Sequence, residues 1–297
     1  MRLIADMSQY SPSWSRTQRD LFFKCPTAWA LRYARIGTSS QGSRFEQITA
    51  WNMMLRALKT TIIEQLDALR SGIEWTASVA EISLRGHLKN LIRQNNERIG
   101  PAKLDALLQF ATHRMKLLWR TDVFLDLSQR LGVHWSVLDR TESEHVDGFD
   151  LFASPDLVVR RQSKWHLIRL DMQARRMSAE EQLEALVMVL WSLKRSGLPS
   201  TVEQFEVQTI GWRKGAWVVH RLQVKESEVL TAYEMIRKDI TAMKACADVA
   251  RYSIESIPLA AKESSCQQCS FKPRCLADLS LGEKKRLRVE RLGQHIQ

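Results

Sequence analysis

The sequence has no apolar run long enough to cross a bilayer and no opening segment typical of secretion. The longest uninterrupted apolar stretch, from Ala185 to Trp191, is far shorter than the roughly 20 residues that a membrane-spanning helix needs. The opening residues, MRLIADMSQYSPSW, lack a charged region followed by an apolar one. We therefore expect a soluble, cytoplasmic protein with no membrane contact.

Cysteine is scarce, and its count is odd. The chain has 5 cysteines among 297 residues, whereas the disulfide framework of a small secreted protein uses a dense and even set. In a cytoplasmic protein such a number favours metal ligation over disulfide bonds. Cys246 lies in a helical pattern and is expected to be a small, buried apolar side chain.

Acidic side chains are in deficit, and the sequence shows no internal repeat or low-complexity segment. The chain carries 44 Lys and Arg residues against 33 Asp and Glu, a formal net charge of +11. This balance attracts polyanions, and nucleic acid is the leading partner. The 10 Trp residues add side chains that can stack on the bases of single-stranded nucleic acid, although most are expected in the core.

Four cysteines form a pattern typical of a metal centre. Cys266, Cys269 and Cys275 have the spacing C-x2-C-x5-C, and Cys25 is the natural fourth ligand. A tetrahedral zinc site or a cubane iron-sulfur cluster takes four thiolates. This set predicts that the N-terminal and C-terminal segments meet at one centre. The alternative is that the cysteines are unligated or form a chance disulfide.

Hydrophobic periodicity divides the chain into a helical part and a mixed part. Residues 11–36 predict a helix that breaks at Pro26, because proline disfavours helix at the preceding residue and thereby turns the Cys25 thiol away from the helix axis. From residue 134 onward, three runs predict consecutive strands of a meander. Helical periodicity over 43–72 and 77–119, interrupted at Ser71-Gly72 and Gly100-Pro101, predicts a block of about three helices. Further helices are predicted over 178–195 and 226–250, and strands over 134–141, 148–161, 164–173, 204–212 and 216–224.

The order of these elements predicts one α/β domain, 1–297, with a helical insertion. Its parts are an N-terminal helix with the first cysteine (1–42), a helical block (43–130), an α/β core (131–250), and a Cys cluster with a basic tail (251–297). The tail carries five basic residues between Lys284 and Arg291. It is interpreted as a solvated helix face or as a DNA-contacting arm.

Two carboxylates in the strand-rich part are candidate metal ligands. Asp156 follows Pro155, and Asp171 is followed by Met172 and Gln173. Strand alternation predicts Arg169, Asp171 and Gln173 on one face. Two carboxylates held together can bind Mg²⁺ or Mn²⁺, which activates water for phosphodiester hydrolysis. In the alternative, Asp156 ends a turn and Asp171 pairs with an arginine.

The separate segments together resemble RecB-like PD-(D/E)XK nucleases that carry a four-cysteine iron-sulfur cluster. The segment SWSRTQRDLFFKCPTAWALRYA resembles the family's opening motif, GSRFEQ its G-x-x-x-H-E helix start, SPDLVV its G-x-x-D strand, LIRLDMQ its D/E-x-K strand, QLEAL its Q-x-x-x-Y helix, and CQQCSFKPRC its terminal cluster motif. The resemblance implies the restriction-endonuclease-like core. It also implies a [4Fe-4S] cluster on Cys25, Cys266, Cys269 and Cys275, and catalytic positions at Asp156, Asp171, Gln173 and Gln182.

Three positions depart from the family's motifs. Phe45 stands where the family has a metal-binding His, Gln173 where it has the catalytic Lys, and Leu186 where it has a Tyr. A neutral amide does not supply the charge that the Lys offers to the phosphate. Arg169 is a candidate replacement for the missing cation, and Glu46 for the missing metal ligand.

These departures lead to three functional readings. The first is a catalytically impaired or inactive subunit that binds single-stranded or branched DNA beside a helicase or another protein, in repair, recombination or defence against foreign DNA. The second is an active Mg²⁺- or Mn²⁺-dependent DNA nuclease that uses Asp156 and Asp171 with Gln173 or Arg169 in place of Lys. The third is a zinc-stapled interaction subunit with no nucleic-acid role.

Overall fold

The computed structural model describes residues 11–34, 48–129, 134–174 and 179–267, together with residues 269, 271 and 275. Contacts divide the chain into two compact units, and neither unit is continuous in sequence. Unit 1 comprises Met1–Glu46, Ser143–Phe152 and Thr231–Gln297, and unit 2 comprises Gln47–Glu142 and Ala153–Leu230. Folding of 1–297 as a single domain stays a prediction.

Unit 2 begins with the helices that periodicity predicts. Thr49 and Thr76 are the N-cap residues of two of these helices. The Thr49 hydroxyl oxygen accepts the Asn52 N–H at 3.2 Å, and the Thr76 hydroxyl oxygen accepts the Val79 N–H at 3.3 Å. Such bonds satisfy amides that have no partner within the helix. Pro101 opens a further helix, where its missing N–H costs nothing. The helices are α3 (Ala50–Arg70), α4 (Ala77–Gln94), α5 (Pro101–Leu118) and α6 (Asp122–Gln129).

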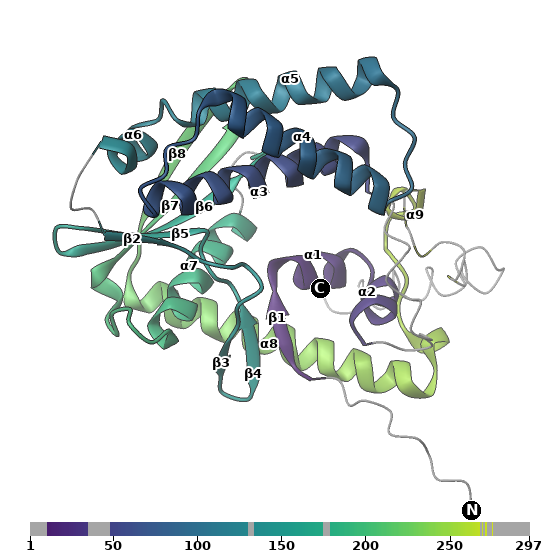
Figure 1. Ribbon diagram of the computed structural model, residues 1–297. Coiled ribbons are helices and arrows are strands. Elements are labelled where there is room, and N and C mark those ends of the chain that lie inside the picture. Colours follow the sequence, from purple (N-terminus) through teal and green to yellow (C-terminus); the bar gives the residue numbers. More distant parts are fainter. Residues whose placement is uncertain are drawn as a thin grey trace, which may run out of the picture. The chain divides into compact units, whose positions relative to one another are not determined.

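A five-stranded mixed sheet forms the other layer of unit 2, and this confirms the α/β class. Its strand order is β2-β5-β6-β7-β8. β6 and β7 are parallel, the other pairs are antiparallel, and helix α7 (Ala179–Lys194) lies between β6 and β7 in the chain (Figure 1). The strands are β2 (His134–Val137), β5 (Leu157–Arg161), β6 (Lys164–Asp171), β7 (Phe205–Arg213) and β8 (Ala216–Gln223), and a short 3-10 turn, Val202–Gln204, precedes β7.

The strand predicted over 148–161 is wrong as a single element. It consists of β4 (Phe149–Phe152) and β5, which belong to two different sheets. Residues 153–156 between them pair with neither sheet as a strand, since Pro155 has no N–H to donate and restricts Ser154. The predicted three-stranded meander is therefore replaced by β2, β5 and β6. The hairpin of β3 (Glu144–Val146) and β4 is inserted between β2 and β5 in the chain.

The core of unit 2 packs the helical layer onto one face of the sheet. Leu58, Ile62 and Leu66 recur at helical spacing on α3, and all are fully buried. They join a cluster with apolar side chains of α4, α5 and α6 and with alternate residues of the central strands. Each buried side chain of this size contributes about 1.5–3 kcal/mol. This packing fixes α3 against the strands that carry the predicted carboxylates.

Unit 1 contains a second, three-stranded sheet and the helices that carry the cysteines. The sheet order is β1-β4-β3, with β1 parallel and β3 antiparallel to β4. The Trp14 indole N–H donates to Asp239 Oδ2 at 3.1 Å, and Arg19 Nε donates to the same oxygen at 2.8 Å. The elements are β1 (Ser13–Ser15), α1 (Arg16–Lys24), α2 (Pro26–Tyr33), β3 (Glu144–Val146), β4, the part of α8 (Glu226–Tyr252) from Thr231 on, a 3-10 turn (Ile254–Ser256) and α9 (Ser264–Gln267).

The predicted helix break at Pro26 is confirmed. Cys25 has extended backbone angles and lies between α1 and α2, ending one helix and capping the next. Its thiol accepts the Ala28 N–H at 3.4 Å. None of the described helices is both long enough and apolar enough to cross a membrane.

Candidate functional site

The first predicted carboxylate, Asp156, lies at the start of β5 and is held by backbone groups. Its side chain is 1% exposed. The Asp156 N–H donates to Ile168 O at 2.9 Å, and the Leu170 N–H donates to Asp156 Oδ2 at 2.7 Å. Both partners lie on β6, so the carboxylate is fixed between the two strands that also carry the other predicted site residues.

Three cations surround the Asp156 carboxylate. Lys59 Nζ lies 2.7 Å and Arg140 Nε 2.9 Å from Oδ1, and Arg169 Nη1 lies 3.8 Å from Oδ2. Lys59 comes from α3, Arg140 from the turn after β2, and Arg169 from β6. Lys59 Nζ also donates to Leu170 O at 3.2 Å, and Arg169 Nε lies 3.4 Å from Glu184 on α7. The cluster therefore contains three cations and two carboxylates.

The electrostatics follow from burial and from these neighbours. Burial alone raises the pKa of Asp156, but the charges of Lys59, Arg140 and Arg169 outweigh it and hold that pKa well below its usual value. Burial lowers the pKa of Lys59, and the positive charges of Arg140 and Arg169 lower it further. Asp156 raises it, but the net result is a pKa of about 7. Asp156 is thus an ionised carboxylate at neutral pH.

This set of neighbours does not fit a divalent metal ion at Asp156. Both carboxylate oxygens already accept from the protein, Oδ1 from two cations and Oδ2 from a backbone N–H and an arginine. Mg²⁺ needs oxygen ligands in near-ideal octahedral geometry. Placing it here adds a double positive charge beside three cations, which repel it.

Asp171 and Gln173 lie at and just beyond the end of β6. Asp171 is partly buried, and its Oδ1 accepts the Gln173 N–H at 3.0 Å. The strand ends at Asp171, so the predicted alternation does not extend to Gln173. The exposed Gln173 side chain instead accepts the Trp51 indole N–H at 2.6 Å.

The other predicted catalytic positions contribute less to this cluster. Gln182 is exposed on α7. Glu184, two residues further along, pairs with Arg169 instead. Glu46 and Phe45 lie outside the described residues, as does the basic tail.

Lys59, Arg140 and Glu184 were not predicted as site residues from the sequence. Lys59 left one readable signal, because it stands at helical spacing between Leu55 and Ile62 on the apolar stripe of α3, where a buried lysine requires a partner. Arg140 lies in a turn, where no local pattern marks it as a site residue. Its contact with Asp156 becomes visible only in the folded structure.

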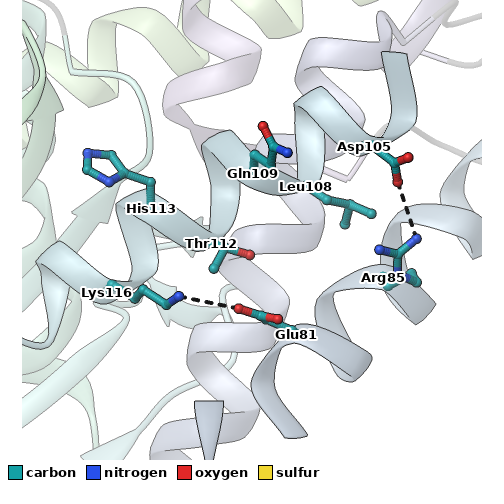
Figure 2. A pocket seen from close by; sticks show the side chains of 8 residues that line it. All are labelled: Glu81, Arg85, Asp105, Leu108, Gln109, Thr112, His113 and Lys116. Carbon is teal, nitrogen blue, oxygen red and sulfur yellow. Dashed lines mark ion pairs between the residues drawn. The ribbon is translucent and has the colours of Figure 1, made fainter. Parts of the chain in front are cut away.

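Polar cavities flank the helical layer of unit 2. One, of about 410 Å³, lies between α3 and α4, and its described lining holds Arg56, Lys59 and His87 but no carboxylate. Another, of about 590 Å³, lies between α4 and α5. Figure 2 shows that Lys116 points toward Glu81 and Arg85 toward Asp105 across it, at 3.4 Å and 3.5 Å. Oppositely charged side chains there pair with each other. In the cavity at Lys59, the His87 ring contacts Glu64 at 2.8 Å and Lys59 contacts Asp156, while the Arg56 side chain is exposed.

The four predicted cysteine ligands line one pocket in unit 1. Its remaining lining is mainly apolar and includes Ala28, Leu259 and Phe271. Burial raises the pKa of Cys25. The Ala28 N–H lowers this pKa, and the nearby Cys275 and Cys269 sulfurs raise it. Four thiolates are the kind of donor set that a zinc ion or an iron-sulfur cluster takes, and a bound metal would offset both effects.

The sulfur positions themselves do not form a ligand constellation. In the described part of the chain, no group of three or more His, Cys, Asp or Glu side chains is close enough to hold a metal ion. The described structure also contains no disulfide bond. Cys246, predicted to be a small buried apolar side chain, is half-buried beside the Trp29 cluster on α8, and burial raises its pKa to about 11.

No family model matches this chain, and no curated protein matches its sequence significantly.

Proposed function

We propose that this protein binds DNA through a PD-(D/E)XK-like fold of the RecB type and does not cleave it. The carrying observation is the cluster at Asp156. In an active metal site the corresponding carboxylate binds a divalent cation, whereas here the side chains of Lys59, Arg140 and Arg169 contact its oxygens. A neutral Gln173 at the position of the catalytic Lys agrees with loss of cleavage.

The topology of unit 2 supports the fold assignment. An antiparallel β2-β5-β6 group is followed by helix α7 and a parallel strand, β7. Asp156 directly precedes β5 and Asp171 ends the neighbouring strand β6, as the proposed relation requires. Fold alone does not confer activity, so the functional proposal rests on the site.

The charge of the molecule supports DNA as the ligand. The formal net charge of +11 attracts the phosphate backbone over long range. At short range, the cavity beside Lys59 offers the exposed Arg56 guanidinium together with hydrogen-bonding groups of Thr60 and Asn90, whereas its His87 ring already contacts Glu64 at 2.8 Å. A phosphate is the anion that such a lining suits. Single-stranded or branched DNA, presented by a helicase or another subunit, is the proposed form.

We assign the four cysteines a structural role in this proposal. Cys25, Cys266, Cys269 and Cys275 hold a [4Fe-4S] cluster that links the helix break at residue 25 to the C-terminal segment, with zinc as the alternative centre. A zinc-stapled protein without DNA affinity is the competing function. It uses the same cysteines, but gives no account of the cationic cavity.

Cleavage and binding measured in the same samples test the proposal. Anaerobically purified protein is incubated with end-labelled single-stranded, double-stranded and branched DNA and with Mg²⁺ or Mn²⁺. We expect binding without cleavage, and the same result for Asp171→Ala. Cleavage that disappears in Asp171→Ala would overturn the proposal in favour of an active nuclease. Absence of both binding and cleavage would favour the protein-interaction function.

A further inference from the structure

Aromatic side chains enclose one buried guanidinium group in unit 2. Arg114 on α5 is 7% exposed, and its guanidinium carbon lies 5.0 Å from the ring centre of Trp51 and 4.8 Å from that of Trp212. Its Nη1 donates to Met172 O at 2.8 Å. The guanidinium is therefore held between two indoles, directly after the strand that carries Asp171.

The aromatic contacts continue from this centre to the surface. The Phe110 ring meets Trp51 edge-on at 6.1 Å, and His113 meets Trp212 edge-on at 6.3 Å. Phe110 is 56% exposed, and His113 is exposed as well. Trp217 adjoins Trp212 at 5.5 Å. We call Trp51, Phe110, His113, Trp212 and Trp217 the aromatic platform.

The platform is fixed in place by hydrogen bonds that use its polar atoms. The Trp51 indole N–H donates to Gln173, and the Trp217 indole N–H donates to Arg114 O at 2.7 Å. These two N–H groups are already engaged within the protein, so their rings offer a π surface and no donor to a ligand. A rigid surface of this kind suits a flat partner that is recognised by stacking.

The surroundings of the platform are basic. Trp212 pairs with Trp217 across the β7–β8 hairpin, whose tip contains Arg213 and the exposed Lys214. Arg114 adds a cation beneath the rings. An aromatic surface bordered by cations matches the two parts of a nucleotide, a flat base and an anionic phosphate.

We propose that the aromatic platform stacks unpaired bases of single-stranded DNA. This inference rests on the proposed DNA binding and adds the element that distinguishes single strands from duplexes, since paired bases hide their faces. Phe110 is the outermost contact, because more than half of its surface is free for a base.

The test compares an ordinary strand with an abasic one. The double variant Phe110→Ala, His113→Ala removes two exposed rings, and the matched control Phe23→Ala removes a phenyl group that is 61% exposed in unit 1. Binding is measured by fluorescence anisotropy with labelled oligothymidylate and with an abasic oligonucleotide of equal length. Thermal unfolding of each variant verifies that it is folded.

We expect the double variant to bind oligothymidylate roughly 5-fold to 150-fold more weakly, the effect of losing one stacked base. Its affinity for the abasic strand should equal that of the wild type, and Phe23→Ala should change neither. Unchanged affinity for oligothymidylate would overturn the platform while leaving DNA binding intact, and an equal loss on both strands would overturn the stacking role. If the wild-type protein bound neither strand, the proposed function would fall and this inference with it.

Discussion

The carboxylate of Asp156 compensates cations that the fold holds close together. Asp156→Asn keeps the shape of the side chain but removes the carboxylate that contacts Lys59 and leaves Arg169, which is also largely buried, with the Glu184 carboxylate alone. Breaking a buried pair in this way costs about 3–5 kcal/mol, and Arg140, whose side chain is 46% exposed, adds little. We expect urea denaturation to show that loss of unfolding free energy at pH 7.

A matched exposed pair provides the control for Asp156→Asn. Asp105 lies 3.5 Å from Arg85, and both side chains are at least half exposed, so Asp105→Asn should cost less than about 1 kcal/mol. Because the folded pKa of Asp156 is depressed, its stabilisation is present above the usual carboxyl pKa near 4 and lost as pH falls below it. Stability of Asp156→Asn should therefore depend less on pH in that acid range. Equal costs for the two variants would contradict the charge-compensation role.

At the residue scale, motif spacing identified the carboxylates but not their environment. Asp156 and Asp171 were recognisable because each follows a strand-like run with a fixed local pattern. Their partners come from distant segments, so no local pattern predicts that Lys59 and Arg140 meet at Asp156. The chemical character of the site, cationic where an acidic site was expected, became visible only through tertiary contacts.

At the element scale, the packing of β7 against the segment after β6 depends on Gly211. It pairs with Asp171, and a Cβ at this position would lie 2.4 Å from the Ala174 Cβ. Ala174 is further fixed because its N–H donates to Trp212 O at 3.0 Å. Gly211→Ala should destabilise the protein by about 1–3 kcal/mol, the usual cost of overpacking, as measured by thermal or urea unfolding.

Gly86 supplies the opposite expectation for the same substitution. It lies exposed in the interior of α4, with no atom within 4 Å of an added Cβ. Gly86→Ala should stabilise by roughly 0.5–1 kcal/mol, since alanine loses less backbone entropy in a helix. A stabilising Gly211→Ala would show that Ala174 moves aside and that the end of β6 is not tightly packed.

Elements differ in how far the sequence predicts them. Helices α3, α4 and α5 follow from apolar spacing, with a capping threonine before α3 and α4 and Pro101 at the start of α5. The break at Pro26 follows from proline geometry. Each of these causes lies within a few residues. The division of β4 from β5 was missed because both parts favour extended backbone, and the choice of sheet depends on non-local partners. The aromatic platform was equally hidden, since its rings come from two helices and one hairpin.

At the scale of the whole molecule, the cysteines connect segments that lie far apart in sequence. Cys25 caps α2, and Cys266 lies in α9; both line the pocket that also receives Cys269 and Cys275. If these thiolates hold a metal centre, its binding free energy is part of the folding free energy of unit 1. Loss of one ligand should therefore affect both the metal content and the stability of the protein.

Cys25→Ser tests this link, with Cys246→Ser as the matched control. Cys246 is a half-buried thiol of unit 1, whereas Cys25 is buried. Cys246 packs beside Trp29 and does not line the four-cysteine pocket. We expect Cys25→Ser to lose iron and visible absorption after anaerobic purification and to unfold at least about 4 °C lower, since 1 kcal/mol corresponds to roughly 2–4 °C in a chain of this size. Cys246→Ser should keep its iron. Zinc in place of iron in the wild type would identify the alternative centre. Equal metal content in both variants and the wild type would show that Cys25 is a packing residue and that no shared centre joins the two segments.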